Sequence, residues 1–321
     1  MNTLAKLRLH DLAPPQDDFL AAVLDGLGRA RKTLPCKFFY DEAGSALFDA
    51  ICDTPEYYPT RTELGILTAA AGDIADLAGR GGVLIEYGSG SSRKTRLLLD
   101  ALAPALYMPI DISREHMLAA CHTLAQDYSA LHLMAVCADY TRPLRLPAVA
   151  RGGQKRLAFF PGSSIGNFAP LEALRFLKNV AQQLAPDDGF LIGVDLKKDP
   201  AILNAAYNDA AGVTAAFNLN LLARCNRELG ADFNLAAFTH RAFYNEAAGR
   251  IEMHLESTRE QRVQIAGQVF GFVAGETIHT ENSYKYRPDE FRHLAVQAGF
   301  EPQHLWTDVD TLFGVLYLRR R

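Results

Sequence analysis

The turn GSGSS (88–92) follows the apolar segment VLIEY (83–87) and precedes the helix-like segment RKTRLLLDAL (93–102). Glycines let the backbone there approach a ligand closely, beside the positive end of the helix dipole. The dinucleotide-binding pattern G-x-G-x-x-G needs a third glycine at the position of Arg93. With Glu86 before the turn and no third glycine, the turn fits S-adenosylmethionine better, because that ligand has no pyrophosphate to seat. A plain strand-to-helix turn without a ligand is the alternative.

Two carboxylates end the next two strand-like segments. Asp111 lies 23 residues after Gly88, where a carboxylate can accept hydrogen bonds from both ribose hydroxyls. Asp139 ends the following segment, and beside Tyr140 it can meet an adenine amino group. Either acid alone is better explained as a helix N-cap. Three successive strand ends that carry Gly-x-Gly, Asp and Asp indicate a nucleoside site, so we expect S-adenosylmethionine as the co-substrate.

A competing assignment comes from the loop PGSSIGNF (161–168). Its G-x-S-x-G spacing matches the nucleophile elbow of α/β-hydrolases, with Ser164 as the nucleophile. That mechanism also needs a downstream acid followed by a histidine, and Asp289 followed by His293 or His304 supplies this order. The hydrolase assignment leaves the upstream nucleoside pattern unexplained. We therefore favour a loop at the carboxyl end of a sheet, where it would contact a substrate.

The elements that must position these residues alternate between strand and helix. Short apolar runs occur at 83–87, 105–113, 131–140, 157–162 and 189–196, with helix-like segments such as 93–102 and 114–127 between them. This alternation indicates an α/β fold, a mostly parallel sheet with helices on both faces. A helix over 287–298 and the strand-like segments 304–308 and 314–320 end the chain, and we expect these last strands to rejoin the sheet.

After residue 197 the pattern changes to that of a separate, smaller α+β part. Residues 200–229 have helical spacing. RIEMHLES (250–257) alternates strictly and places Ile251, Met253 and Leu255 on one face. Further strand-like segments lie at 261–267 and 277–286.

Helical spacing is also found near the N-terminus, over 17–32 and 43–52. Two prolines then interrupt the chain, before another helix that extends to about residue 78. Thr60 followed by Glu63 predicts a capping box at the start of that helix.

The composition excludes several classes of protein. The chain has 321 residues, 49% hydrophobic and 22% charged, as in soluble globular proteins. At roughly 150 residues per domain, this length suggests about two domains, with one large domain as the alternative. The net charge of −4 comes without a basic block, which argues against a nucleic-acid binder. No segment approaches the roughly 18 apolar residues of a membrane span, and Lys6, Arg8 and Asp11 interrupt any signal-peptide core.

Cysteines and histidines give no sign of a metal site. The five scattered cysteines form no C-x-x-C pair, and the nine histidines show no H-E-x-x-H spacing. We therefore expect reduced thiols, a cytoplasmic protein and no metal ion. We also expect a monomer.

Six longer motifs carry a resemblance to a known family. In order along the chain they are FFYDEAGSALFDAI, TPEYYPTRTE, EYGSGSSRKT, PGSSIGNF, AAYNDAAGVTAAFN and TENSYKYRP. Together they resemble the histidine-specific Nα-methyltransferases of ergothioneine biosynthesis. The resemblance extends from about residue 33 to the end of the chain. Motifs of this length are far more specific than a single glycine pattern.

The resemblance implies a class I methyltransferase domain, which is Rossmann-like, and a smaller α+β substrate-binding domain. We assign residues 1–60, 80–196 and 287–321 to the S-adenosylmethionine-binding domain, and residues 61–79 and 197–286 to the substrate-binding domain. The implied reaction is the transfer of three methyl groups to the α-amino group of L-histidine, which gives hercynine.

By match of motif, the resemblance also implies the site residues. The cofactor residues would be Tyr40, Gly88, Lys94, Asp111, Asp139 and Tyr140, the last in place of the phenylalanine that is usual in this family. The substrate residues would be Tyr57, Gly162, Asn167, Tyr207, Glu281 and Ser283. Tyr40 is also our candidate for orienting the amine, and so for the catalytic residue.

Glu281 and Ser283 are two apart on a predicted strand, so both side chains face the same way. A carboxylate and a hydroxyl on one face can hold the two nitrogens of an imidazole. An indole has only one N–H and would leave part of this pair unmatched. Tryptophan or another amine is nevertheless the alternative acceptor, and a cofactor-binding module without turnover is the alternative outside enzymes. Without the resemblance, a solvated strand face would explain both residues.

Overall fold

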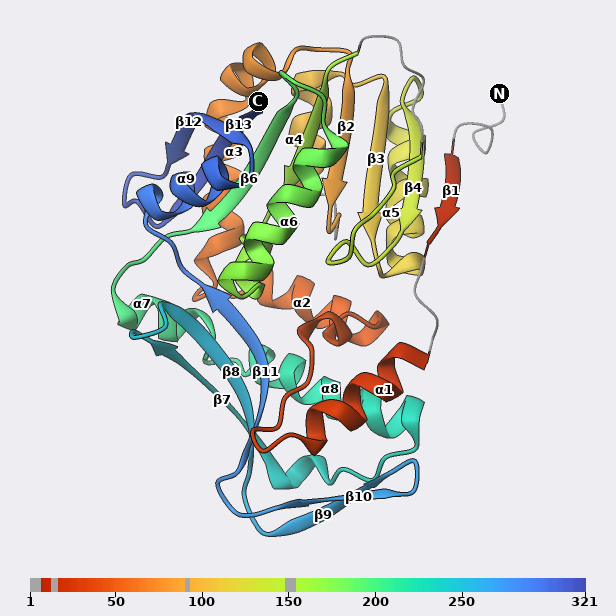
Figure 1. Cartoon of the computed structure of the whole chain (residues 1–321), viewed down its shortest axis with the longest axis vertical. Helices are drawn as coiled ribbons and strands as arrows, with labels where there is room; N and C mark the ends of the chain where they lie inside the picture. Colours follow the sequence, from red (N-terminus) through yellow and green to blue (C-terminus); the bar gives the residue numbers. More distant parts are fainter. Residues whose placement is uncertain (1–6, 13–16, 90–92, 148–153) are drawn as a thin grey trace. The chain divides into compact units, whose positions relative to one another are not determined.

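The strands expected between residues 83 and 196 all form, and they build the centre of an eight-stranded sheet. The computed structural model describes residues 7–12, 17–89, 93–147 and 154–321. The chain divides into unit 1 (Met1–Pro14, Pro59–Lys197 and Lys285–Arg321) and unit 2 (Pro15–Tyr58 and Lys198–Tyr284). Figure 1 labels most of the helices and strands of each unit.

Unit 1 contains the large sheet. Its strands are β1 (Leu7–Asp11), β2 (Val83–Tyr87), β3 (Leu106–Asp111), β4 (His132–Cys137), β5 (Arg156–Phe160), β6 (Gly189–Asp195), β12 (Phe300–Thr307) and β13 (Phe313–Arg320). Their order across the sheet is β1-β4-β3-β2-β5-β6-β13-β12. Neighbours from β1 to β6 are parallel, whereas β13 is antiparallel to both β6 and β12. The predicted mostly parallel sheet is confirmed, and so is the return of the last two strands to it.

Helices cover both faces of this sheet because its central strands are apolar on both sides. Every residue of β2 and β6 is buried. One core cluster joins the sheet to α3 (Tyr58–Ala78), α4 (Arg93–Leu102) and α5 (Arg114–Asp127), and a second joins it to α6 (Pro170–Gln183) and α9 (Pro288–Gln297). Figure 1 shows α6 in front of the strands, with α4 and α5 behind them. This layering of helices on both faces of a mostly parallel sheet is the α/β fold that the sequence predicts.

The edge strand β1 is not predicted from the sequence. Its residues LRLHD are mostly exposed and show no alternating burial. It pairs with β4 in parallel, from Leu7 opposite Leu133 to Asp11 opposite Cys137. A strand held mainly by backbone pairing leaves no apolar pattern in its side chains.

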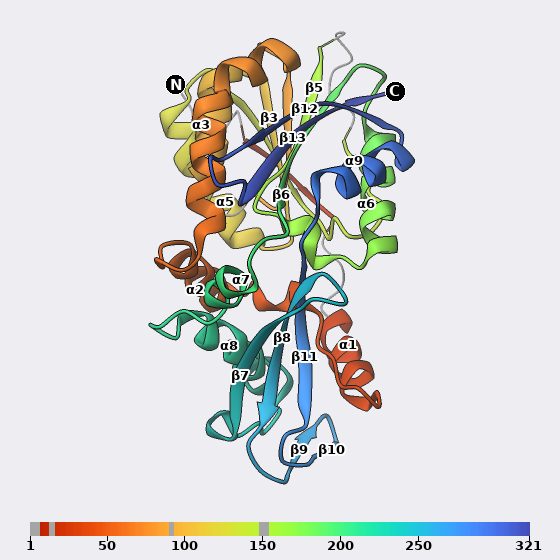
Figure 2. The ribbon, with the colours of Figure 1, turned by 90° about the vertical axis from the view of Figure 1, so that its left-hand side faces the viewer.

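Unit 2 is a separate α+β assembly. Its helices are α1 (Asp17–Gly28), α2 (Glu42–Cys52), α7 (Pro200–Ala206) and α8 (Val213–Leu229), with the 3-10 turns η2 (Cys36–Phe39) and η4 (Leu235–Ala237). Its strands are β7 (Phe238–Asn245), β8 (Arg250–Ser257), β9 (Gln261–Ile265), β10 (Gln268–Phe272) and β11 (Thr277–Tyr284). β8 lies between β7 and β11 in an antiparallel sheet, which Figure 2 shows clearly, and β9 pairs with β10.

The alternating pattern of β8 is confirmed, since Ile251, Met253 and Leu255 are each at most 1% exposed. β7 is not predicted, because most of its residues are half-buried without alternation. No helix in the described part of the chain combines the length and apolar character that a membrane span requires.

The helical spacing over 200–229 belongs to two helices rather than one. α7 ends at its C-cap residue Tyr207, and Gly212, with φ of +72°, precedes α8. The Asp209 carboxylate accepts the backbone N–H groups of Val213 and Thr214, both at 2.8 Å, and so satisfies the start of α8. The break matters because it places Tyr207 at a helix end.

The units divide the chain differently from the predicted domains. The sequence places residues 61–79 in the predicted substrate-binding domain, but Leu67 and Ile74 of α3 pack in a core cluster of unit 1. The prediction for the methyltransferase domain includes residues 15–58, but these belong to unit 2, where the Phe39 ring stacks on Phe217 with the centroids 4.5 Å apart. Periodicity identifies the apolar face of a helix but not the partner that this face packs against.

Candidate active site

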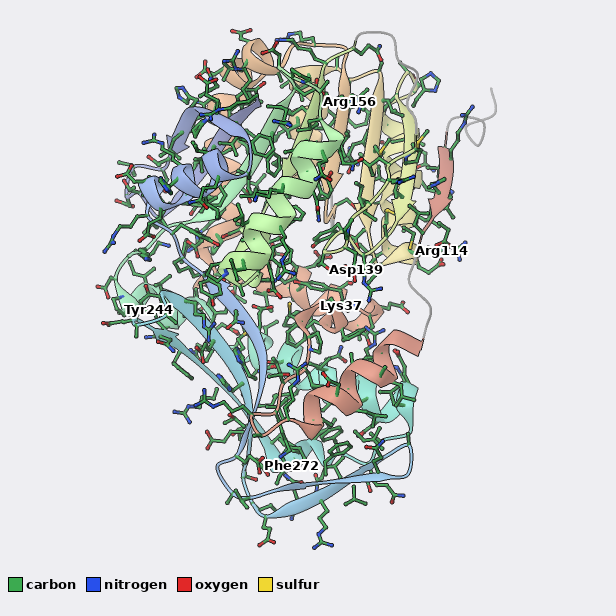
Figure 3. The ribbon with its side chains drawn as sticks, in the orientation of Figure 1. Lys37, Arg114, Asp139, Arg156, Tyr244 and Phe272 are labelled. Carbon is green, nitrogen blue, oxygen red and sulfur yellow. The ribbon has the colours of Figure 1, made fainter. Side chains whose placement is uncertain are left out.

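Unit 1 brings four predicted site segments to one edge of its sheet. Gly88, Asp111, Asp139 and Gly162 lie at or just after the carboxyl ends of β2, β3, β4 and β5. The strand order reverses at β2, which lies between β3 and β5, and ligands of open α/β sheets bind at such a switch point. Figure 3 shows Asp139 at the end of the sheet toward which the parallel strands point, and Arg156 at the opposite end.

The backbone at Gly88 favours glycine. Its φ of +71° lies in the left-handed region, and an added Cβ would stand 3.3 Å from the Tyr140 hydroxyl. The Tyr140 ring therefore packs beside the turn, next to Asp139. The Ser89 hydroxyl is buried and has no hydrogen-bond partner among the described residues. These features fit a polar ligand such as S-adenosylmethionine. Residues 90–92 of the predicted turn lie outside the described residues.

The two predicted carboxylates are held by their own turns. Asp111 accepts the backbone N–H of Ser113 at 2.8 Å, and Asp139 accepts that of Thr141 at 3.0 Å. Asp139 is only 5% exposed, and the Arg142 guanidinium lies 3.6 Å from it. Such side-chain-to-backbone bonds fix the direction of a carboxylate. Both acids are thus oriented groups that can accept hydrogen bonds from a nucleoside.

A buried carboxylate that the sequence analysis missed lies beside this edge. Glu63 of α3 is fully buried, and its Oε2 pairs with Lys94 Nζ and accepts the Gly162 N–H at 2.9 Å. Lys94, a predicted cofactor residue, therefore shares a carboxylate with the predicted substrate loop. The Oε1 atom has no hydrogen-bond partner within the described chain. Gly193 leaves room for it, since a Cβ there would stand 2.2 Å from Oε1.

The capping box predicted from Thr60 and Glu63 is wrong. The helix α3 begins at Tyr58, before Thr60, and the Glu63 side chain pairs with Lys94. One signal in the sequence could have identified Glu63. Gly193 lies inside an otherwise apolar strand, and a glycine in that position often marks the close approach of another group.

The loop after β5 is shaped by two residues in the left-handed region. Gly162 and Ser163 have φ of +76° and +58°, and the 3-10 turn η3 (Ser164–Asn167) follows them. The Ser163 hydroxyl accepts the Asp195 N–H at 2.8 Å, which fixes the loop against the end of β6. Asn167 closes η3 and is half-buried.

This geometry does not support Ser164 as a nucleophile. The elbow requires the serine at a sharp turn from strand directly to helix, whereas η3 separates β5 from α6. The Ser164 hydroxyl donates to the Pro161 carbonyl at 3.0 Å. The ring of His304, one of the predicted partners, packs on Trp306 with the centroids 4.3 Å apart.

A buried ion pair connects two segments of unit 1 near this loop. Lys285 Nζ lies 2.7 Å from the Asp195 carboxylate, and both side chains are at most 1% exposed. The Tyr286 N–H donates to the Asp195 carbonyl at 3.1 Å. A buried charge requires such a partner, because desolvation is costly. Through Asp195 and Ser163, the pair also supports the predicted substrate loop.

Unit 2 brings the other predicted residues together. The Tyr207 hydroxyl donates to Ser283 Oγ at 2.8 Å, and the Tyr57 ring meets the Tyr207 ring edge-on at 6.1 Å. Burial raises the pKa of Tyr57 well above its usual value, with smaller contributions from Tyr207 and then Tyr40 and Glu281. Tyr40 and Tyr57 both pack on Phe48, with ring centroids 5.6 and 6.3 Å away, and Glu281 shares a strand face with Ser283, so these five residues lie in one part of unit 2.

The start of α2 positions Tyr40. Asp41 is the N-cap of this helix, and its carboxylate also accepts the Asn220 amide N–H at 2.8 Å. The Tyr40 ring packs edge-on against Phe48 and Phe217, with centroids 5.6 and 5.8 Å away. Two contacts in different directions thus fix the ring, as an orienting residue requires.

Glu281 and Ser283 lie on β11, directly opposite Met253 and Ile251 of β8. They share the face of the sheet on which β8 presents its buried apolar residues. Ser283 is 4% exposed, so a solvated strand face does not explain it, and Glu281 is half-buried. The predicted common face of the two residues agrees with this register.

The other face of the same sheet carries a cluster of potential metal ligands. Donor atoms of Glu252, His254 and His279 lie within 4.8 Å of one another, the one such group found in the described residues. The two imidazole rings are stacked at 4.5 Å and 15°, so their in-plane lone pairs do not converge on one ion. Glu252 is also paired with the Arg250 guanidinium at 2.7 Å. This arrangement is a hydrogen-bonded cluster, and the lack of a metal stays a prediction.

Comparison with known proteins identifies the family to which this chain belongs. The sequence pattern of the family described as "Histidine-specific methyltransferase, SAM-dependent" matches residues 19–320. The chain is 44% identical to the histidine N-alpha-methyltransferase of Mycolicibacterium smegmatis over 297 residues. These aligned residues cover 90% of this chain and 91% of that protein. It is 43% identical over 299 residues to the histidine N-alpha-methyltransferase of Mycobacterium tuberculosis. That alignment covers 91% of this chain and 92% of the relative.

A more distant relative is named for another acceptor. The 4-dimethylallyltryptophan N-methyltransferase of Aspergillus fumigatus is 29% identical over 320 residues, which cover 92% of this chain and 93% of that protein. The family pattern and the two closer relatives span nearly all of both units. The chain belongs to the family of histidine-specific, S-adenosylmethionine-dependent methyltransferases.

Proposed function

We propose that this protein transfers three methyl groups from S-adenosylmethionine to the α-amino group of L-histidine, giving hercynine for ergothioneine biosynthesis. The observation that carries the substrate assignment is the bond from Tyr207 to Ser283, with Glu281 on the same face of β11. Membership of the family supports the reaction, and histidine is the acceptor named for two relatives more than 40% identical.

Residues of unit 1 would hold most of the cofactor. Asp111 would accept the ribose hydroxyls, Asp139 would accept the adenine amino group, and Tyr140 would cover the ring. Support comes from the fixed direction of both carboxylates and from the Tyr140 ring beside Gly88. Lys94, steadied by its carboxylate partner, would attract the carboxylate of the bound cofactor.

Glu281 and Ser283 would recognise the imidazole of histidine through hydrogen bonds. A neutral imidazole presents one N–H and one acceptor nitrogen. Glu281 would accept the N–H, and the Ser283 hydroxyl would donate to the other nitrogen. Asn167 and Tyr207 have donors for the substrate carboxylate, and Tyr57 and Gly162 would complete the substrate residues.

Methyl transfer requires mainly that the protein position the substrate amine against the methyl group of the cofactor. The cofactor supplies a methyl group already activated by its sulfonium. The protein must present an unprotonated amine in line with the bond that breaks. Because α-amino groups titrate around roughly 8, no strong base is needed near neutral pH. Tyr40 would orient the amine, and tyrosine rings would favour the growing ammonium charge by cation–π contact, worth about 0.5–2 kcal/mol.

Another amino acid is the second candidate acceptor, and the relative that is named for a tryptophan derivative is the reason to consider it. An indole offers one N–H and no acceptor nitrogen. It would satisfy Glu281 and leave the Ser283 donor unmatched, at a cost of roughly 1–3 kcal/mol. The polar pair therefore favours histidine.

The deciding experiment is mass spectrometry of the purified protein incubated with S-adenosylmethionine and all twenty amino acids together. We expect a gain of three methyl groups on histidine alone. Methylation of another amino acid would keep the cofactor assignment and overturn the acceptor. Methylation of none of the twenty would overturn the proposed function and direct the search to other small amines.

A further inference from the structure

A chain of hydrogen bonds connects the predicted substrate residues of unit 2 to three further side chains. His240 Nε2 on β7 lies 2.9 Å from the Tyr207 carbonyl oxygen, and its Nδ1 lies 2.9 Å from the amide nitrogen of Asn218 on α8. The Asn218 Oδ1 accepts the hydroxyl of Thr280 on β11 at 2.8 Å. Asn218 and Thr280 are buried, with 0% and 2% exposed. The Tyr207 hydroxyl closes the chain by donating to Ser283.

The chemistry of the partners fixes the direction of each bond. A carbonyl oxygen can only accept, so the ring proton of His240 must be on Nε2. Nδ1 then carries a lone pair, which accepts one N–H of the Asn218 amide. The other N–H of that amide donates to the His254 carbonyl at 3.0 Å. Burial lowers the pKa of His240, which favours the neutral ring that this arrangement needs.

One end of the network is a β-bulge. The pairing of β11 with β8 shifts between His279 and Glu281, so Thr280 is the extra residue. Its hydroxyl also lies 3.0 Å from the Met253 carbonyl. A bulge changes the aim of the side chains beside it. Here the next side chain is Glu281, and Ser283 follows two residues later.

The other end is the C-cap of α7. Carbonyl groups at a helix end lack the partner that the next turn would provide. The His240 N–H supplies a partner to the Tyr207 carbonyl, and the Tyr207 hydroxyl bonds Ser283. Tyr207 is therefore held through its backbone as well as its ring. Through β7 and α8, the network joins the two elements that carry Tyr207, Glu281 and Ser283, the end of α7 and β11.

We propose that His240, Asn218 and Thr280 are positioning residues for the imidazole of the substrate. They hold Tyr207, Glu281 and Ser283 in the arrangement that recognises histidine, and none of the three contacts the substrate itself. This inference rests on the proposed function. Because Asp111 and Asp139 belong to unit 1, damage to the network should weaken histidine while S-adenosylmethionine is retained.

The test is steady-state kinetics of two variants at one position. His240→Leu removes both ring nitrogens, whereas His240→Gln keeps an N–H donor for the Tyr207 carbonyl. Loss of a buried bond predicts a KM for histidine about tenfold higher in His240→Leu, and one within about threefold of wild type in His240→Gln. The KM for S-adenosylmethionine should change by less than about twofold in both. A general loss of folded enzyme would lower the maximum rate and leave both KM values unchanged, so it would not raise the KM for histidine alone.

Thr280→Val tests the far end of the network. Valine keeps the shape of threonine and removes the hydroxyl, so the bulge loses its bond to Asn218. We expect the KM for histidine to rise about fivefold. If His240→Leu does not fold, Thr280→Val and His240→Gln decide the inference by the same comparison of the two KM values.

A matched control is available on the same sheet. His254 adjoins Met253 in β8, so its side chain faces the other side, where its ring packs between Phe243 and His279. Its bond to Asn218 uses the backbone and survives substitution. His254→Leu and His254→Gln should lower the melting temperature while the KM for histidine stays at the wild-type value.

The outcomes distinguish a failure of the proposed function from a failure of the positioning network. Wild-type protein that does not methylate histidine would contradict the proposed function. If the wild-type protein methylates histidine and the KM for histidine is unchanged in His240→Leu and Thr280→Val, only the proposed role of the network is contradicted. Equal rises of both KM values, or the same rise in the His254 variants, would reduce the network to a structural role.

Discussion

The candidate site residues are mostly polar side chains that the fold buries and pairs. Tyr207 donates to Ser283 in a buried bond. The fully buried carboxylate of Glu63 accepts the Gly162 N–H and pairs with Lys94. An unsatisfied buried group costs about 1–3 kcal/mol, so such side chains need either a protein partner or a ligand. Their direction is set before any ligand arrives, which is what a reaction governed by positioning requires.

Glu281 gives the sharpest prediction for a single residue. Glu281→Ala removes the proposed acceptor of the imidazole N–H and should raise the KM for histidine by about one to two orders of magnitude. The KM for S-adenosylmethionine should stay near the wild-type value. Glu281→Gln keeps an acceptor oxygen and should lie between the two. Kinetics with each substrate varied in turn checks this, and equal loss for both substrates would contradict the role.

Tyr40 is predicted to act through its hydroxyl. Tyr40→Phe keeps the ring contacts with Phe48 and Phe217, so folding and cofactor affinity should persist. Turnover should fall by about tenfold or more if the hydroxyl orients the amine. Mass spectrometry of the one-, two- and three-methyl products measures each step. Full turnover at all three steps in this variant would remove the hydroxyl from the mechanism.

Glu86 makes stability depend on pH. Burial raises its pKa from 4.5 to about 7, although Tyr107 and Thr95 donate hydrogen bonds that lower it. The folded chain therefore keeps a proton that the unfolded chain releases, and the free energy of unfolding falls as pH rises from 4.5 to about 7. The loss is absent below this window, complete above it, and of order 3 kcal/mol.

Glu86→Gln should remove this slope. Denaturant unfolding of both proteins between pH 4 and pH 8, at intervals of about half a unit, measures it. The difference between wild type and variant isolates Glu86 from other titrating groups. An unchanged slope in the variant would show that Glu86 titrates alike in the folded and unfolded chain.

At the scale of elements, the apolar pattern of a segment is reliable where the segment is buried on one side or on both. The strand predicted at 83–87 and the helix predicted at 114–127 have the observed bounds of β2 and α5. β1 is missed because its side chains are mostly exposed. The break between α7 and α8 is missed because a capped turn at Asp209 continues the helical spacing of the residues around it. Hydrogen bonds of backbone and caps leave weaker patterns than apolar burial does.

The contact between α3 and β6 yields a prediction about packing. In Gly193→Ala the new Cβ would stand 2.2 Å from Glu63 Oε1, and the carboxylate would have to leave Lys94 and Gly162. We expect a loss of about 1–3 kcal/mol in the free energy of unfolding. The KM for S-adenosylmethionine should rise with it, because Lys94 loses its support.

The control is a strand glycine without neighbours. An added Cβ at Gly271 of β10 meets nothing within 4 Å, so Gly271→Ala should change the free energy of unfolding by less than about 0.5 kcal/mol. Denaturant unfolding of both alanine variants decides the matter. Similar small effects in the two would show that the carboxylate of Glu63 can move at little cost.

At the scale of the whole molecule, local patterns identify the fold more readily than the boundaries between units. The motifs that carry the family resemblance include Tyr40, Tyr57, Tyr207 and Glu281, and unit 2 groups these residues. Glu63 escapes sequence reasoning because its partners Lys94 and Gly162 lie 31 and 99 residues away in the chain. His240 escapes it for the same reason, since its bonds to Tyr207 and Asn218 depend on the register of three elements.

The discontinuous make-up of unit 2 has a consequence for biosynthesis. Its first part, residues 15–58, leaves the ribosome about 140 residues before its second part, 198–284, begins. At roughly 5–20 residues per second that interval lasts on the order of 10–30 s. During it, Phe39 lacks the ring of Phe217 on which it will stack, and Asp41 lacks Asn220. The early segment thus emerges with apolar side chains that have no core to pack against, and exposed apolar side chains of this kind are what nascent-chain chaperones shield.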